Sequence, residues 1–165
     1  MKTIVRLVIA LMLIVNSNGA EPVKAPNKQK FRIYILMGQS NMAGRGAVEK
    51  EDKTPHPRVL MLQTNDTWVP AIEPLTRDPN KVHGVGPGLA FGKAMAEKFP
   101  NVTIGLVATA VGGTPLSRWQ KGGDLYEKAV LFWNGAKIRE RGVSLLHFGK
   151  AEAVKIRVVV LHACV

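Results

Sequence analysis

The sequence predicts an α/β fold built on a parallel sheet with helices on its faces. Short runs dense in β-branched and aromatic residues alternate with longer stretches in which apolar residues recur at helical spacing. The run VTIGLVATAV (102–111) is almost continuously apolar, which is typical of a central strand buried on both faces. Strands and helices in alternation favour a parallel sheet that helices cover.

The first part of the predicted sheet comes from three short segments. FRIYILM (31–37) is predicted as a buried strand that ends at Gly38, and RVLML (58–62) as a second strand. TWVPA (67–71) is predicted as an edge segment, because Pro70 has no N–H to donate to a neighbouring strand.

A glycine-rich turn then leads into a predicted helix that precedes the central strand. Leu89, Phe91, Met95 and Phe99 have near-helical spacing in it, and Pro100 ends it. This helix is the first of the two expected to cover the sheet.

The rest of the chain predicts a loop, a helix and a last strand. GGTPLSRW (112–119) follows the central strand as a loop. DLYEKAVLFWNGAKIRERG (124–142) is predicted as a helix, and KIRVVVLHACV (155–165) as a final strand-like run.

The first 20 residues predict a secretory signal peptide. Lys2 and Arg6 precede the apolar run 7–15, and small and polar residues follow up to Ala20. A membrane anchor is the alternative, but the apolar run is shorter than the roughly 20 residues that cross a bilayer. We therefore expect a secreted or periplasmic protein with no membrane attachment once residues 1–20 are removed.

The composition argues against nucleic-acid and metal sites. The formal net charge is +11, but the basic residues are scattered and form no basic helix or aromatic-basic patch, so we expect no nucleic-acid partner. Cys164 is the single cysteine, which excludes a disulfide within one chain. The four histidines lack metal-ligand spacing, so no metal is expected; they are His56, His83, His147 and His162.

The segment ILMGQSNMAGRG (35–46) contains the first candidate for chemistry. Ser40 follows a predicted strand and Gly38, at the place where a sharp turn could lift a nucleophilic hydroxyl clear of the sheet. Backbone N–H groups around such a turn can hold an oxyanion. The alternative is that Ser40 only caps a helix that starts near Asn41, and the spacing alone does not decide between the two.

The second candidate is the pair Gly112 and Gly113, directly after the central strand. Paired glycines let the backbone approach a bound group closely, although such pairs are most often plain turns. Loops at the carboxyl ends of neighbouring strands share one crevice in an open α/β sheet, so we expect this pair to face Ser40.

The glycine-rich HGVGPG (83–88) superficially suggests a phosphate loop. It follows no clear strand, it lacks the lysine and hydroxyl residue of a nucleotide-binding loop, and Pro87 interrupts it. A turn at the entrance of a helix is the preferred interpretation.

Five segments in order resemble the sialate O-acetylesterase-like carbohydrate esterases (SASA domain) of the SGNH hydrolase superfamily. The resemblance covers about residues 31–130 and rests on YILMGQSNMAGRG, DKTPHPRVLML, WVPAIEPL, GVGPGLAFGKAMAEKFPNVTIGLV and AVGGTPLSRW. It implies a flavodoxin-like three-layer α/β/α fold. It also implies an esterase that removes O-acetyl groups from sialic acid or acetylated polysaccharides without a cofactor or metal.

The resemblance assigns roles by position. Ser40 matches the nucleophile, and its own N–H together with that of Gly112 or Gly113 matches the oxyanion donors. In the family a histidine takes the serine proton, an aspartate orients that histidine, and water releases acetate from the acyl-enzyme. The neighbouring residues expected to shape the pocket are Gln39, Asn41 and Thr114.

Two parts of the family pattern are missing from the sequence. The family has a Trp-His-Gln-Gly-Glu segment whose glutamine donates to the oxyanion, and this chain reads LLHFGKAEA there. His147 and Gly149 match, but Phe148 and Lys150 replace the glutamine and the glutamate. Loss of one oxyanion donor typically lowers turnover by about 10²–10³.

The Asp-x-x-His segment of the family is also not found. His162 has Val159, not aspartate, three residues before it. We therefore expect an impaired enzyme, in which a reading-frame change or early stop near residue 131 replaced the original C-terminal half. A sheet without its last strands is expected to leave an unpaired edge and a poorly soluble chain.

The expected organisation is a signal peptide (1–20), a linker (21–30), the N-terminal part of an esterase domain (31–130) and a divergent tail (131–165). Two other functions remain open from the sequence. One is a carbohydrate-binding relative that keeps the crevice without the chemistry. The other is a basic protein for anionic polymers, whose affinity would fall steeply with salt.

Overall fold

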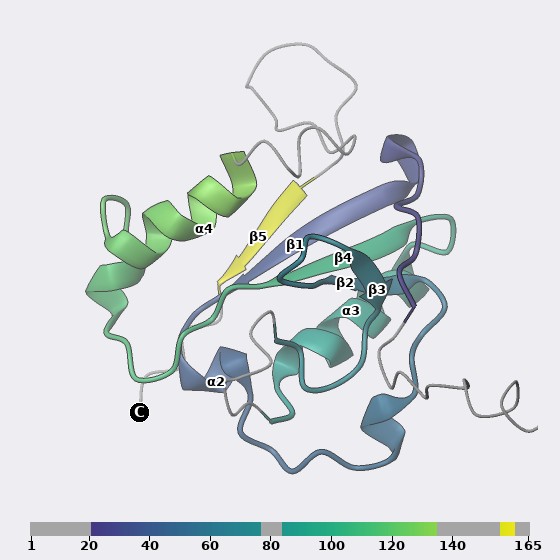
Figure 1. The fold of residues 1–165 in the computed structure, drawn as a ribbon, viewed down its shortest axis with the longest axis horizontal. Helices are drawn as coiled ribbons and strands as arrows, with labels where there is room; N and C mark the ends of the chain where they lie inside the picture. Colours follow the sequence, from purple (N-terminus) through teal and green to yellow (C-terminus); the bar gives the residue numbers. More distant parts are fainter. Residues whose placement is uncertain (1–20, 77–83, 135–155, 161–165) are drawn as a thin grey trace, which may run out of the picture.

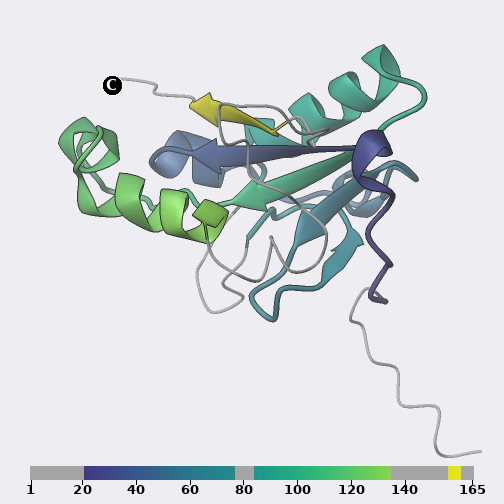
Figure 2. The same cartoon turned by 90° about the horizontal axis from the view of Figure 1, so that it is seen from above.

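The computed structural model describes residues 21–76, 84–134 and 156–160. In this part of the chain, one β-sheet lies between helices α3 and α4, which cover its opposite faces (Figures 1 and 2). The predicted signal peptide and most of the predicted tail lie outside the described residues. Within those residues, no helix has the length and apolar character that crossing a membrane requires.

The described sheet has five strands in the order β3-β2-β4-β1-β5. All neighbours are parallel except β3, which pairs antiparallel with β2 at one edge. The strands are β1 (Phe31–Met37), β2 (Val59–Leu62), β3 (Trp68–Pro70), β4 (Thr103–Ala108) and β5 (Ile156–Val160). The helices are α2 (Ser40–Ala43), α3 (Pro87–Lys98) and α4 (Asp124–Asn134), with 3₁₀ turns η1 (Lys28–Lys30), η2 (Glu51–Lys53) and η3 (Leu116–Trp119).

The predicted α/β class is confirmed, and the predicted elements lie close to the observed ones. The strand predicted at 102–111 ends at Ala108, where the chain leaves the regular ladder. The helix predicted at 124–142 is present to Asn134, and its predicted remainder lies outside the described residues. The predicted edge segment is β3, and Pro70 is its last residue.

Strand β1 explains why the sheet is buried on both faces. Alternate side chains of a strand point to opposite faces, so an apolar β1 contributes to two cores. One core lies against α4 and contains Phe31, Ile33, Ile35 and Met37 with Trp119, Leu125 and Ala129. The other lies against α3 and contains Tyr34 and Leu36 with Leu89, Ala96, Ile104 and Leu106.

The winding of the chain reverses at β1. From β1 the chain passes through α3 to β4 on one side, and later β5 pairs with β1 on the other side. The first strand of the chain, β1, therefore lies between β4 and β5, as in doubly wound α/β sheets whose strand order reverses at the first strand. In such sheets ligands bind beyond the carboxyl ends of the strands at the reversal, which here is the end of β1.

Part of the predicted linker (21–30) belongs to the sheet. The N–H of Val23 donates to the carbonyl O of Trp68 at 2.7 Å, and the two residues form an isolated antiparallel bridge. This contact covers part of the outer edge of β3, which reduces the exposed hydrogen-bonding edge of the sheet.

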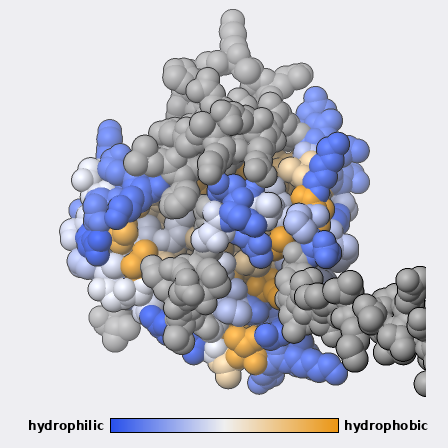
Figure 3. Space-filling view, in the orientation of Figure 1, coloured by the Kyte–Doolittle hydropathy of each residue, from blue (hydrophilic) through white to orange (hydrophobic). Residues whose placement is uncertain are grey.

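The described surface is mostly hydrophilic on the face in Figure 3, where the hydrophobic residues form small separate patches. Among the described residues, the large hydrophobic side chains that are exposed are Val23 and Leu116. Leu116 lies in the loop that follows β4, near the candidate site described next.

We predict that Gly92 of α3 cannot be enlarged without loss of stability. A Cβ at this position would lie 2.8 Å from Cδ1 of Leu106 and 3.0 Å from Cγ1 of Val59, so the helix packs directly on the sheet. Gly92→Val should lower the free energy of unfolding by about 1–3 kcal/mol, because overpacking forces the neighbours to move. Denaturant unfolding measures this, with Ala94→Val on the exposed side of the same helix as the control.

Helix propensity alone would make Gly92→Val neutral or slightly stabilising, because valine is a better helix former than glycine. A loss at Gly92→Val no larger than that at Ala94→Val would therefore contradict the predicted overpacking against the sheet. The Ala94→Val control is expected to cost no more than about 0.7 kcal/mol.

Candidate functional site

Ser40 is the first residue of α2 and follows the end of β1 after Gly38 and Gln39. The φ of Gly38 is +144°, which a residue with a side chain rarely adopts, so the glycine permits the sharp turn out of the strand. The Ser40 side chain does not cap the helix. Instead, its hydroxyl donates to Oε1 of Gln39 at 3.1 Å, and Ser40 stays partly accessible.

The pairing of β1 with β4 brings Gly112 to Ser40. The regular register runs from Phe31 opposite Thr103 to Leu36 opposite Ala108. Beyond the strands, the N–H of Val111 donates to the carbonyl O of Gly38 at 2.9 Å, which continues the same alignment.

In that alignment Gly112 lies opposite Ser40. A Cβ placed on Gly112 would be 3.8 Å from Cβ of Ser40. The two candidate loops therefore meet at the carboxyl end of the sheet, as the sequence predicts.

Gly113 and Asn41 lie beside this pair. Gly113 has a φ of +71° and open space where a Cβ would project, and both Gly112 and Gly113 are exposed. Asn41, the second residue of α2, is also exposed. The structure thus places Ser40 next to Gly112, with Gln39 in contact with the Ser40 hydroxyl.

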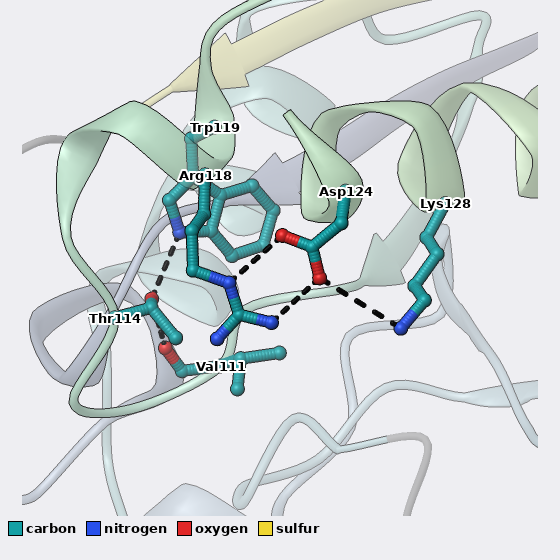
Figure 4. A network of polar contacts seen from close by, with 6 residues as sticks. All are labelled: Val111, Thr114, Arg118, Trp119, Asp124 and Lys128. Carbon is teal, nitrogen blue, oxygen red and sulfur yellow. Dashed lines mark hydrogen bonds and ion pairs between the residues drawn. The ribbon is translucent and has the colours of Figure 1, made fainter. Parts of the chain in front are cut away.

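Thr114 holds the glycine loop in place through hydrogen bonds within the loop. Its buried hydroxyl donates to the carbonyl O of Val111 at 2.7 Å and accepts the indole N–H of Trp119 at 2.9 Å (Figure 4). Trp119 in turn is buried in the core against α4. The hydroxyl of Thr114 is therefore engaged in fixing the backbone on either side of Gly112 and Gly113.

An ion pair ties the same loop to the start of α4. The guanidinium of Arg118 donates two hydrogen bonds to the carboxylate of Asp124, at 2.8 and 2.6 Å (Figure 4). Lys128, one helical turn further, lies 3.9 Å from the same carboxylate. The hydrogen bonds from Arg118 lower the pKa of Asp124 from its ordinary 3.8 to about 2.

The glycine-rich turn at 84–88 clamps the segment that follows Ser40. Val85 exchanges hydrogen bonds with Gly46, at 2.9 and 3.1 Å, and its carbonyl O also accepts the N–H of Arg45. A Cβ at Gly44 would collide with the backbone at Gly84, so the two segments touch backbone to backbone. The turn leads into α3 at Pro87, which agrees with the predicted helix entrance.

Sequence reasoning missed two charged residues, Arg45 at the site and Glu73 in the segment that follows β3. The guanidinium of Arg45 lies directly against Gly112, and Arg45 stands within the same motif as Ser40. The carboxyl of Glu73 is almost completely buried. Burial raises the pKa of Glu73, and the N–H groups of Leu75 and Gly86 oppose this rise.

No local sequence pattern predicts the contact of Arg45 with Gly112, because the contact forms only where the two loops approach each other in the folded chain. For Glu73, the charged residue within the otherwise apolar WVPAIEPL was the available signal.

Among the described residues, no histidine lies beside Ser40. His56 is the single histidine there, and its Nδ1 accepts the N–H of Arg58 just before β2 begins. The N–H of Ile104 donates to Arg58, which places His56 at the amino end of the sheet, opposite to Ser40. Within residues 21–76, 84–134 and 156–160, no cluster of three or more His, Cys, Asp or Glu residues could hold a metal ion.

We predict that Thr114→Val destabilises the loop. The substitution leaves the buried indole N–H of Trp119 and the carbonyl O of Val111 without the hydroxyl. The expected loss is about 1–3 kcal/mol in the free energy of unfolding. Guanidinium unfolding measures it, and Thr64→Val at an exposed turn is the matched control.

We predict that Asp124 contributes to stability only above acidic pH. Its folded-state pKa of about 2 lies below the ordinary 3.8, so its contribution is present above about pH 4 and is lost as the pH falls towards 2. Asp124→Asn should remove this part of the pH dependence. Thermal midpoints between pH 5 and 2 test it, with Glu97→Gln as a surface control; parallel curves for wild type and Asp124→Asn would contradict it.

Comparison with known proteins agrees with the resemblance in the sequence. The family model described as carbohydrate esterase, sialic acid-specific acetylesterase (SASA), matches residues 30–156. A probable carbohydrate esterase from Arabidopsis thaliana is 42% identical over 117 residues, which cover 60% of this chain and 45% of the relative.

Solved structures are also similar to this chain. The X-ray structure of that Arabidopsis thaliana protein has a TM-score of 0.56 and 36% identity, and the match covers 68% of this chain and 53% of the other. The crystal structure of NanS has a TM-score of 0.50 and 18% identity, covering 70% of this chain and 51% of the other, and supports the fold alone.

The chain thus spans about half the length of these relatives. The family match covers most of the chain and includes the two loops that meet at the carboxyl end of the sheet. This chain belongs to the SASA family of carbohydrate esterases.

Proposed function

We propose that this chain carries the nucleophile of a serine esterase that removes O-acetyl groups from carbohydrates, either sialic acid or an acetylated polysaccharide. The observation that supports it most directly is the approach of Ser40 to Gly112, with 3.8 Å between Cβ of Ser40 and the Cβ position of Gly112. A hydroxyl opposite an open backbone turn can attack a carbonyl whose oxygen then meets N–H groups.

In the proposed mechanism the acetyl ester lies between the two loops. Oγ of Ser40 attacks the carbonyl carbon, and the N–H groups of Ser40 and of Gly112 or Gly113 hold the resulting oxyanion. The alcohol of the sugar leaves, and water then releases acetate from the acyl-serine. Oε1 of Gln39 accepts a hydrogen bond from the Ser40 hydroxyl in the resting protein and so orients it. Asn41 lies exposed on α2 next to Ser40.

We propose that turnover by this chain is slow. The serine proton needs a base, and His56, the one histidine among the described residues, lies at the other end of the sheet. In the sequence, Phe148 replaces the family's glutamine donor, and His162 lacks an aspartate three residues before it. Both features favour reduced activity, by about 10²–10³ for the missing donor alone.

A carbohydrate-binding protein without activity is the second candidate, because the crevice can be retained where the base is missing. We also propose that the protein is exported, on the strength of residues 1–20. N-terminal sequencing of the protein recovered from its native host would reveal whether those residues are removed.

We predict that hydrolysis of 4-nitrophenyl acetate by this chain depends on Ser40. Ser40→Ala should reduce the rate to the uncatalysed background, because the attacking hydroxyl is lost. Ser117→Ala, an exposed serine in the loop after β4, should leave the rate unchanged. Equal rates for wild type and Ser40→Ala, together with binding of acetylated sugars, would favour the binding protein instead.

A further inference from the structure

Backbone hydrogen bonds hold Arg45 and the residues on either side of it. The N–H of Arg45 donates to Val85 at 3.1 Å, and Gly44 and Gly46 on either side pair with Gly84 and Val85. The backbones of Gly44 and Gly84 lie so close together that neither position has room for a side chain. The start of the Arg45 side chain is therefore fixed relative to α2 and Ser40.

The Arg45 guanidinium lies at the wall of the candidate site. A Cβ placed on Gly112 would collide with Nη2 of Arg45 and would lie 3.6 Å from its Cζ. The same Cβ position is 3.8 Å from Cβ of Ser40. The guanidinium and the Ser40 side chain thus both lie next to the Cβ position of Gly112. The guanidinium can reach this position because Gly112 has no side chain.

From this geometry we infer that the charge of Arg45 stabilises the oxyanion that forms when Ser40 attacks an ester. The inference rests on the proposed function of Ser40. A cation a few ångströms from developing negative charge lowers the energy of the transition state more than that of the neutral substrate. Arg45 adds this charge to the N–H groups of the glycine loop.

The step balances without further reactants beyond the ester and water. The Oγ–carbon bond forms as the π pair of the carbonyl moves onto its oxygen, and the proton of Ser40 passes to solvent water, because no histidine lies beside Ser40 among the described residues. Attack on a fluorophosphonate is analogous: an Oγ–phosphorus bond forms, fluoride leaves, the proton of Ser40 passes to water, and the negative oxygen on phosphorus in the transition state occupies the place of the oxyanion. This reagent reports on attack by Ser40 even where deacylation is slow.

The experiment measures the rate at which a fluorophosphonate labels the full chain. Ser40→Ala should abolish labelling, and Arg45→Gln should slow it by about tenfold or more. Arg45→Lys should recover part of the rate, because it restores the charge but not the planar fork. Arg32→Gln is the matched control, since Arg32 stacks on Phe99 (Cζ 3.7 Å from the ring centroid) and β1 begins beside it, at the other end of the sheet.

The salt dependence separates charge from packing. The wild-type rate should fall as ionic strength rises, because the guanidinium is exposed, whereas the Arg45→Gln rate should change less. This comparison stays informative if Arg45→Gln is less stable, since the wild-type curve alone must slope downward.

Two failures are distinguishable. Labelling of the wild type that survives Ser40→Ala, or no labelling at all, would overturn the proposed function and this inference with it. Ser40-dependent labelling that is equally fast in Arg45→Gln, equally slow in Arg45→Gln and Arg45→Lys, or independent of salt would overturn the role of the Arg45 charge and leave the proposed function standing.

Discussion

The parallel pairing of β1 with β4 is the constraint on which the candidate site depends. Six residue pairs set the register, and the hydrogen bond from Val111 to Gly38 carries it past the ends of both strands. A shift of one residue would move every side chain of β1 to the opposite face. Because β1 is buried on both faces, the register cannot slip, and Gly112 is placed opposite Ser40.

Beyond the strands, two kinds of contact hold the loops of the candidate site. In the segment after Ser40, close backbone contact between Gly44 and Gly84 holds the chain, and a side chain at either glycine would break this contact. After Gly112, a buried hydroxyl and an indole hold it instead, since Thr114 links Val111 to Trp119. The first contact depends on the absence of side chains at Gly44 and Gly84, and the second depends on hydrogen bonds between buried polar groups. The exposed site lies between these two contacts.

The strands were the part of the fold most accessible from the sequence. FRIYILM and the apolar core of VTIGLVATAV are buried on both faces, so their nearly continuous apolar residues identify them as strands in the sequence. The two candidate loops follow the carboxyl ends of these strands. The rule that such loops share a crevice was sufficient to bring Ser40 and Gly112 together before any coordinates.

Other features depend on contacts between distant segments and leave no local pattern. Val23 reads as part of a linker, yet it bridges to Trp68, because the edge of β3 is open to it. The HGVGPG glycines read as a turn, and their contact with Gly44 appears only in three dimensions. The contact of Arg45 with Gly112 is of the same kind.

The wide separation in sequence between β1 and β4 has a consequence for how the site comes into being. Loop closure over the intervening β2, β3 and α3 must precede any contact between Ser40 and Gly112, and contacts of that kind form slowly. No short peptide around GQSNMAG could reproduce the arrangement. The surroundings of the Ser40 hydroxyl are therefore complete only once the sheet has folded. A molecule that binds to both loops would stabilise the pairing of β1 with β4 and so the folded sheet.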